Sequence, residues 1–208
     1  MLENNKSILI GILGIQGAYF KHKEILGSLS VKSVIVKYSR QLNDIDGLII
    51  PGGETTAFTK QMSYEITFEN LQKFANVKPT FGTCAGIITQ AKGINNKKIL
   101  QLKVLDVTVE RNAYGSQINS FINDIDLTFD NTNKPFQAIF IRAPKITNIG
   151  NNIKVLASLK NNPVLIENKL HLGATFHPEL TDDLRIHKYF IDKVESLAKT
   201  PKRKDAKK

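Results

Sequence analysis

Three features of the 208-residue sequence predict an α/β protein with a three-layer architecture, in which helices cover both faces of a mainly parallel central sheet. Short apolar runs alternate with segments of helical spacing through the first half of the chain. One of these runs, residues 8–13, is apolar on both faces, as in a central parallel strand. The second half consists mainly of strand-like segments separated by Asn-rich turns, which predicts an antiparallel extension.

The first half predicts a βαβαβ order, which implies parallel strands joined by covering helices. Its strands are short apolar runs, at residues 8–13, 32–36, 47–50 and 80–82. Its helices carry apolar residues at helical spacing, at residues 18–29, 55–76 and from the turn at residue 84 to about residue 92. Ligands bind at the carboxyl ends of such strands, where the loop at residues 51–54 and the turn at Cys84 both lie.

The second half predicts six further strands and a closing helix. The strands are residues 104–110, 117–122, 136–141, 155–159, 163–167 and 170–176, and the helix is residues 184–197. The chain is long enough for one substantial core, and its 41% hydrophobic and 23% charged residues are ordinary for a globular protein. We therefore expect a single domain over residues 1–198.

Half of the formal net charge of +10 lies in the last ten residues, where six basic residues stand against one acid. This segment, residues 199–208, contains Pro201 and no apolar pattern, so it predicts a disordered, solvated basic tail. The remaining charge is spread thinly over the body, which argues against a nucleic-acid-binding protein.

The chain has one cysteine, so no internal disulfide can form, and a reducing, cytoplasmic setting fits best. The apolar stretch at residues 7–15 is short and broken by glycines. We therefore expect neither a signal peptide nor a membrane span.

Cys84 is the first candidate for chemistry, because it lies in Gly82-Thr83-Cys84-Ala85-Gly86 between a predicted strand and a predicted helix. A nucleophile on a tight strand-to-helix turn needs small neighbours, as in the elbow of serine hydrolases. A thiolate is the better nucleophile at neutral pH, and a helix N-terminus favours it. The alternative is a buried structural cysteine, which is the commoner fate of a lone free thiol.

A cysteine nucleophile needs a base, and His177 is the best candidate among the four histidines. It ends an apolar strand, Pro178 keeps it extended, and Glu179 projects to the same side, where it can accept the imidazole N–H. His22 and His187 fall in helical segments and are expected to face solvent, and His171 has no carboxylate two residues away. The alternative is a surface strand end with an incidental His and Glu.

An acyl-transfer site also needs donors for a developing oxyanion. The backbone N–H of Ala85 supplies one at a nucleophile elbow, and Gly53 can supply another, because paired glycines let a peptide turn its N–H into a site. Gly52-Gly53-Glu54 is unsuited to phosphate, since it places an acid there and lacks the P-loop lysine. The alternative for this loop is a plain turn.

Six segments together resemble a known family, in order and with matching spacing: Gly14-Ile15-Gln16-Gly17-Ala18, Pro51-Gly52-Gly53-Glu54-Thr55, Gly82-Thr83-Cys84-Ala85-Gly86, Glu110-Arg111-Asn112-Ala113-Tyr114-Gly115-Ser116-Gln117, Phe140-Ile141-Arg142-Ala143-Pro144 and His177-Pro178-Glu179-Leu180-Thr181. The chain resembles the class I (triad) glutamine amidotransferases over residues 7–194, and most closely the glutaminase subunit of pyridoxal 5′-phosphate synthase. This resemblance implies a flavodoxin-like fold.

The resemblance also implies roles for individual residues. Cys84 is the implied nucleophile, His177 the base and Glu179 its partner. The implied oxyanion donors are Gly53 and Ala85, and Gln16 lies near the contact with a partner protein. L-glutamine is held by residues of three segments: Gly52, Gly53, Glu54, Arg111, Ile141 and Arg142. No cofactor or metal is implied, since no cluster of His, Cys, Asp and Glu shows ligand spacing.

The implied activity is hydrolysis of L-glutamine to L-glutamate and ammonia through a cysteine thioester. The ammonia is expected to pass to a separate synthase subunit that builds pyridoxal 5′-phosphate, and the glutaminase to be weak until it docks there. Three alternatives remain: a subunit serving another amidotransferase, a γ-glutamyl hydrolase, and a non-catalytic binding protein on the same fold. Arg111 and Arg142 favour the implied activity over the hydrolase, and Cys84, His177 and Glu179 together argue against the binding protein.

Overall fold

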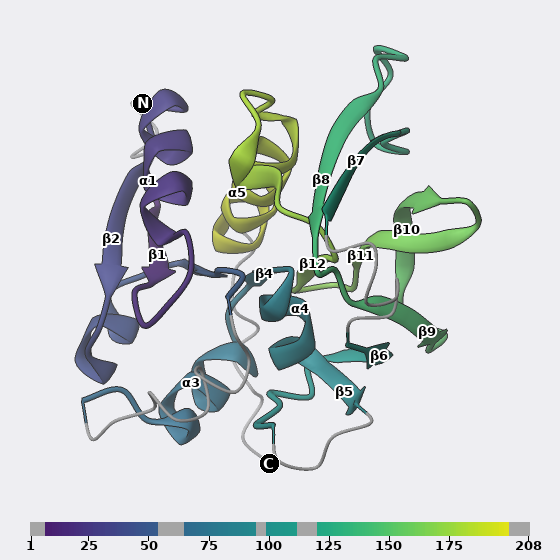
Figure 1. Cartoon of the computed structure of the whole chain (residues 1–208). Helices are drawn as coiled ribbons and strands as arrows, with labels where there is room; N and C mark the ends of the chain where they lie inside the picture. Colours follow the sequence, from purple (N-terminus) through teal and green to yellow (C-terminus); the bar gives the residue numbers. More distant parts are fainter. Residues whose placement is uncertain (1–6, 54–64, 95–98, 112–119, 200–208) are drawn as a thin grey trace, which may run out of the picture.

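The computed structural model (Figure 1) describes residues 7–53, 65–94, 99–111 and 120–199, which form a seven-stranded sheet of order β10-β11-β12-β4-β3-β1-β2 and two smaller sheets. The strands of the large sheet have these bounds: β1 Leu9–Leu13, β2 Lys32–Val36, β3 Gly47–Ile50, β4 Thr80–Thr83, β10 Lys154–Leu159, β11 Asn162–Glu167 and β12 Leu172–Ala174. From β2 to β12 all neighbours are parallel, whereas β11 is antiparallel to both β12 and β10. The predicted α/β class, with its antiparallel extension, is confirmed.

Helices cover both faces of the large sheet and have these bounds: α1 Tyr19–Ser28, α3 Phe68–Ala75, α4 Ala85–Gln90 and α5 Arg185–Lys199. Figure 1 shows α1 and α5 on one side of the sheet and α3 and α4 on the other. In agreement, Leu26 of α1 and Phe190 of α5 belong to one hydrophobic cluster, whereas Leu71 of α3 and Ile87 of α4 belong to two others. The predicted three-layer arrangement is therefore confirmed.

The two smaller sheets extend the second half of the chain. One contains β5 Ala91–Ile94, β6 Leu105–Glu110 and β9 Lys145–Ile149, and the other pairs β7 Ser120–Ile125 with β8 Phe136–Ile141. β9 has no counterpart among the predicted strands. Its sequence, Lys-Ile-Thr-Asn-Ile, carries only a weak apolar signal, and in the structure only Ile146 of this strand is buried. Residues 117–119, predicted as the start of β7, lie outside the described residues.

Two predicted helices have different limits in the structure. The helix expected to reach residue 92 ends at Gln90, because Ala91 is extended and pairs with Leu105 of β6. The helix expected at residues 55–76 begins, in its described part, at Phe68, where the Thr67 hydroxyl accepts a hydrogen bond from the Asn70 N–H. Residues 55–64 lie outside the described residues. A short 3₁₀ helix, Ser39–Asn43, had not been predicted.

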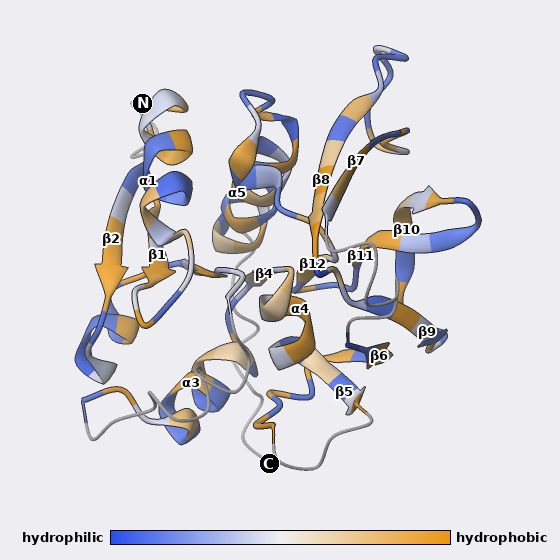
Figure 2. Cartoon of the chain, in the orientation of Figure 1, coloured by the Kyte–Doolittle hydropathy of each residue, from blue (hydrophilic) through white to orange (hydrophobic). Residues whose placement is uncertain are grey.

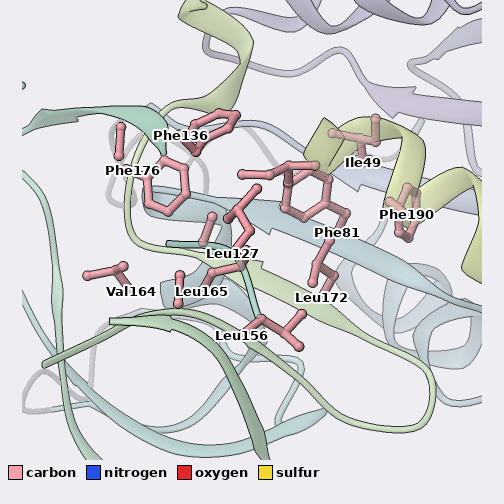
Figure 3. Close-up of a cluster of buried hydrophobic side chains, with 14 of the residues drawn as sticks. Ile49, Phe81, Leu127, Phe136, Leu156, Val164, Leu165, Leu172, Phe176 and Phe190 are labelled. Atoms are coloured by element: carbon pink, nitrogen blue, oxygen red, sulfur yellow. The ribbon is translucent and has the colours of Figure 1, made fainter. Parts of the chain in front are cut away.

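The largest hydrophobic cluster is drawn in Figure 3, where the ring of Phe81 neighbours that of Phe190 and the ring of Phe136 neighbours that of Phe176. All four phenylalanines are fully buried. Figure 2 shows that hydrophilic residues collect instead at the loop that joins β10 to β11 and at the tip of the β7–β8 hairpin. The core thus joins β4 and β12, the two strands that lead into the candidate site, to α5 and β8.

The described chain ends with α5 at Lys199, the first residue of the predicted basic tail. The rest of that tail, residues 200–208, lies outside the described residues, so the limits of the domain and the tail stay a prediction. None of the helices in the described ranges has the length and apolar content needed to cross a membrane.

Candidate active site

Cys84 lies on the sharp turn between β4 and α4, with φ of 49° and ψ of −107°. A non-glycine residue at such angles is strained and persists only when its surroundings impose it. Here the backbone N–H of Cys84 donates to the Ala174 carbonyl at 2.9 Å, and α4 begins at the next residue. The small neighbours are needed, because a methyl group on Gly86 would meet the carbonyl of Ile50. The predicted elbow geometry is thus present at this cysteine.

His177 reaches the same edge of the sheet because β12 is the parallel neighbour of β4, with Ala174 opposite Thr83. Its backbone N–H donates to the Ile139 carbonyl of β8 at 2.9 Å. Its Nδ1 lies 2.7 Å from Oε1 of Glu179, and its side chain is 12% exposed. Since Glu179 takes Nδ1–H, Nε2 is the nitrogen left to exchange a proton with Cys84.

The electrostatics of this group favour a charged imidazole. Burial works against the charge on His177, but the hydrogen bonds and charges of Cys84 and Glu179 outweigh burial and raise the pKa of His177 to about 10. Burial also opposes ionisation of Glu179, yet the neighbouring His22 and His177 leave the pKa of its carboxyl below the usual value. An imidazolium beside the cysteine stabilises a thiolate at neutral pH, which is the reactive form of the side chain.

The loop at Gly52 and Gly53 packs against Cys84 and His177. A methyl group on Gly52 would lie 2.6 Å from Cε1 of His177 and 3.0 Å from Cβ of Cys84. The Gly52 N–H donates to the Thr83 hydroxyl at 3.1 Å, which anchors the loop to β4. On its other side, a methyl group on Gly53 would come within 2.9 Å of the Gln16 side chain. The structure therefore brings Gln16 and both glycines together, and Ala85 begins α4, where N–H groups have no intrahelical partner.

The residues expected to hold a substrate lie at the ends of β8 and β6, and the end of β8 is beside Cys84. The carbonyl oxygen of Ile141, the last residue of β8, is 3.7 Å from the Cys84 Sγ. Arg142 follows it in an exposed position with φ of 44°. Arg111 follows β6, whose Glu110 pairs with Lys145, so Arg111 lies near the turn after Arg142. Glu54, the remaining residue that was expected to hold the substrate, lies outside the described residues.

A family model described as the SNO glutamine amidotransferase family matches residues 12–196. The chain belongs to this family. Its relatives include "Pyridoxal 5'-phosphate synthase subunit PdxT" of Thermotoga neapolitana, which is 48% identical over 89% of this chain and 99% of the relative. The protein of the same name from Dictyoglomus turgidum is 48% identical over 88% of this chain and 96% of its own length.

The fold of this SNO-family chain is also found among solved structures. One described as "Crystal structure of glutamine amidotransferase" superposes with a TM-score of 0.82 at 37% sequence identity, over 89% of this chain and 98% of the other. The resemblance to glutamine amidotransferases expected from the six segments is therefore confirmed.

Two histidines of the SNO-family chain lie elsewhere than predicted. We expected His22 and His187 to face solvent, but both are fully buried between α1, α5 and the sheet. Nδ1 of His22 is 2.9 Å from Nε2 of His187, and Nε2 of His22 is 3.6 Å from Oε2 of Glu179. The prediction was wrong because it considered only that both histidines lie in helices, and not which face of each helix they occupy.

The missed signal was in the spacing. His22 precedes the buried Ile25 and Leu26 by three and four residues, and His187 precedes the buried Phe190 and Ile191 by the same intervals. Residues at these intervals share one helix face, so both imidazoles belong to the apolar faces of their helices.

His171 lies at the opposite end of the strands from Cys84. It precedes β12, and its Nδ1 is 2.9 Å from the hydroxyl of Thr80, the first residue of β4. Burial, aided by Lys193, lowers the pKa of His171 to about 4, so it is neutral at physiological pH. Within the described ranges, no group of three or more His, Cys, Asp or Glu side chains is arranged to hold a metal ion.

Proposed function

We propose that this SNO-family protein is a glutaminase that hydrolyses L-glutamine to L-glutamate and ammonia, and that it supplies the ammonia to a synthase subunit making pyridoxal 5′-phosphate. The observation that carries the proposal is the arrangement of Cys84 on its strained turn beside His177, whose other nitrogen lies 2.7 Å from Glu179. The relatives named as pyridoxal 5′-phosphate synthase subunits, matched over nearly their whole length, support the choice of pathway.

In the proposed reaction, the Cys84 thiolate attacks the side-chain amide carbon of glutamine, and the amide oxygen becomes an oxyanion. Backbone N–H groups of Ala85 and Gly53 stabilise this charge. The intermediate then collapses, its C–N bond breaks, and the imidazolium of His177 gives its proton to the departing ammonia. The resulting γ-glutamyl thioester is attacked by water, with neutral His177 as base, and breaking the C–S bond releases glutamate and the thiolate.

The zwitterionic substrate needs a cation for its carboxylate, an acceptor for its ammonium group and dipoles for its amide. We assign the first role to Arg142, which follows the end of β8 beside Cys84, and to Arg111, which follows the end of β6. Glu54 takes the second, by resemblance to the family. The Ile141 carbonyl, 3.7 Å from the Cys84 Sγ, and the peptides of the glycine loop supply the third.

Gln16 provides a route by which the partner controls the reaction. Its side chain lies against Gly53, and a methyl group on Gly17 would meet the carbonyl of Gly52. A synthase subunit that docks at Gln16 therefore presses on the loop that carries an oxyanion donor. We propose that docking reorients a peptide of this loop and so activates the glutaminase. Because the reaction requires a reduced thiol, we place it in the cytoplasm.

The test is ammonia release from L-glutamine, measured with and without the cognate synthase subunit. We expect slow release from the chain alone and a marked increase with the partner. A glutamine analogue carrying a chloroketone should form one adduct, at Cys84, and block release. No release in the presence of the partner would overturn the glutaminase proposal, and activation by a different synthase would overturn only the choice of pathway.

A further inference from the structure

A continuous row of buried polar side chains runs from the candidate triad into the α1–α5 layer. Glu179, which contacts His177 through Oε1, faces His22 of α1 through Oε2 at 3.6 Å. His22 in turn contacts His187 of α5 at 2.9 Å. His22 and His187 are fully buried and Glu179 is 2% exposed. Buried imidazoles that have a carboxylate for a neighbour are costly unless their hydrogen bonds are matched, so the arrangement points to a role.

The positions of the donors can be worked out from two orphaned atoms. In the described part of the chain, Nδ1 of His187 and Oε2 of Glu179 have no hydrogen-bond partner. If His22 donated through Nδ1, His187 would carry a buried, unpaired Nδ1–H, and a lone pair of His22 would face the carboxylate. If both histidines carry the proton on Nε2, His187 donates to His22, and the His22 N–H points at Glu179. Buried unpaired donors are rare, so the second arrangement is favoured.

His22 also contacts the anchor of the glycine loop. Its Nε2 is 3.4 Å from the Thr83 hydroxyl, which accepts the Gly52 N–H at 3.1 Å. One imidazole therefore borders both the acid that orients His177 and the side chain that holds the loop with the proposed oxyanion donor.

We infer that His22, held in its tautomer by His187, is a positioning residue that orients Glu179 and Thr83 and stabilises the ionised carboxylate. The inference rests on the proposed function, because orienting Glu179 matters only if His177 exchanges protons with Cys84. It assigns a function to α1 and α5 that reaches beyond packing against the sheet.

The charges around the row agree with this assignment. Burial is the largest influence on both histidines: it lowers the pKa of His22, and it lowers the pKa of His187 to about 3, so both are neutral at physiological pH. The groups that face Glu179 are His22 and His177, with His187 behind His22 and Cys84 behind His177. The backbone N–H of Glu179 also lowers the pKa of its carboxyl, and His177 contacts Oε1, so within the described residues the His22 N–H is the side-chain donor that faces Oε2.

The first test is made on the wild-type protein, so it depends neither on enzymatic activity nor on how well a variant packs. Nitrogen NMR of the histidine side chains in the wild-type protein should show His22 and His187 as neutral imidazoles with the proton on Nε2 at neutral pH. Spectra of His22→Gln and His187→Gln supply the assignment. A charged His22, or a proton on its Nδ1, would overturn the inference, even if the protein proves to be an active glutaminase.

The second test compares variants by steady-state kinetics in the complex with the synthase subunit. His22→Leu removes the donor, whereas His22→Gln keeps an amide N–H near the position of Nε2. We expect His22→Leu to lower kcat by roughly 10- to 100-fold with KM nearly unchanged, because the variant leaves the buried Glu179 charge without the polar group that faces it. The acidic limb of its pH–rate profile should move to higher pH, because Glu179 then protonates more readily. His22→Gln should recover much of both changes.

His171→Asn is the matched control, because His171 is also a buried, neutral histidine paired to a β4 threonine but lies away from Glu179. It should be less stable yet keep the kcat and the pH profile. If His22→Leu behaves like this control, the inference is wrong. If His22→Leu does not fold, the inference is tested instead by the pH–rate profile of His22→Gln and by the tautomers of His22 and His187 in the wild-type protein. A wild-type complex that releases no ammonia would instead overturn the proposed function and leave the tautomer result standing.

Discussion

The imidazole of His177 lies between two groups that both favour its charge, with Glu179 Oε1 2.7 Å from its Nδ1 and Cys84 on its other side. Two features of the fold bring these groups together. β12 runs parallel to β4, so the ends of both strands reach one edge, and Pro178 begins the short 3₁₀ helix that returns Glu179 to His177.

Replacing Cys84 should lower the pKa of His177. Cys84 contributes both a hydrogen bond and a charge to the rise toward 10, and burial, the largest influence, opposes them. In Cys84→Ala, burial and Glu179 alone remain, so the imidazole should titrate at a clearly lower pH. NMR titration of His177 in both proteins measures the change. An unchanged pKa would mean that the two side chains do not interact as described.

Substitutions of the base, His177, and of its partner, Glu179, should reduce turnover by different amounts. His177→Asn should reduce glutaminase turnover by several orders of magnitude, because it removes the group that transfers the proton. Glu179→Gln should reduce turnover less, since Glu179 orients and stabilises the imidazolium without transferring a proton. Turnover in the synthase complex is the measurement, with His171→Asn as the control. Equal losses in His171→Asn and His177→Asn would show that His177 had been chosen wrongly as the base.

Stability should fall in mild acid because of His171. Its pKa is about 4 in the folded protein and about 6.5 for an exposed histidine, so between these values the unfolded chain binds one more proton. The free energy of unfolding therefore decreases as the pH falls from 6.5 to 4, by up to about 1.4 kcal/mol per pH unit from this residue. Urea unfolding across this range should give a flatter dependence in His171→Asn than in the wild type. Parallel curves would contradict the assignment.

Deleting residues 200–208 should leave melting temperature, glutamine turnover and synthase docking unchanged. The segment is strongly basic and has no apolar spacing to pack, and it follows the last residue of α5. The deletion protein should only be retained less strongly on a polyanion column at low salt. A marked loss of turnover or docking would show that the tail belongs to the working surface.

The sequence predicted best where a residue's environment could be read from its neighbours in the chain. β2, β3 and β8 have the predicted limits, because continuous or alternating apolar runs determine burial locally. The positions of Cys84 and His177 followed from strand ends, since parallel neighbours end at one edge.

The errors arose where burial depended on tertiary packing. β9 pairs with β6 although only Ile146 among its residues is buried, so composition gave little indication of a strand. The helical phase of His22 and His187 indicates that both lie on apolar helix faces, but that α1 and α5 place these faces together on one side of the sheet depends on tertiary packing. The contact of His22 with Glu179 joins residues far apart in the sequence, and it is the part of the site that the motifs did not contain.

The most direct test of the account is the synthesis of pyridoxal 5′-phosphate by the synthase subunit mixed with wild-type chain or Cys84→Ser. With L-glutamine as nitrogen source, we predict product from the wild-type mixture and almost none from Cys84→Ser, because a hydroxyl at this position is far less ionised than a thiol. Free ammonium should restore synthesis in the Cys84→Ser mixture, since only the ammonia supply has been lost. Glutamine-dependent synthesis that survives in Cys84→Ser, or synthesis that ammonium does not restore, would contradict the account.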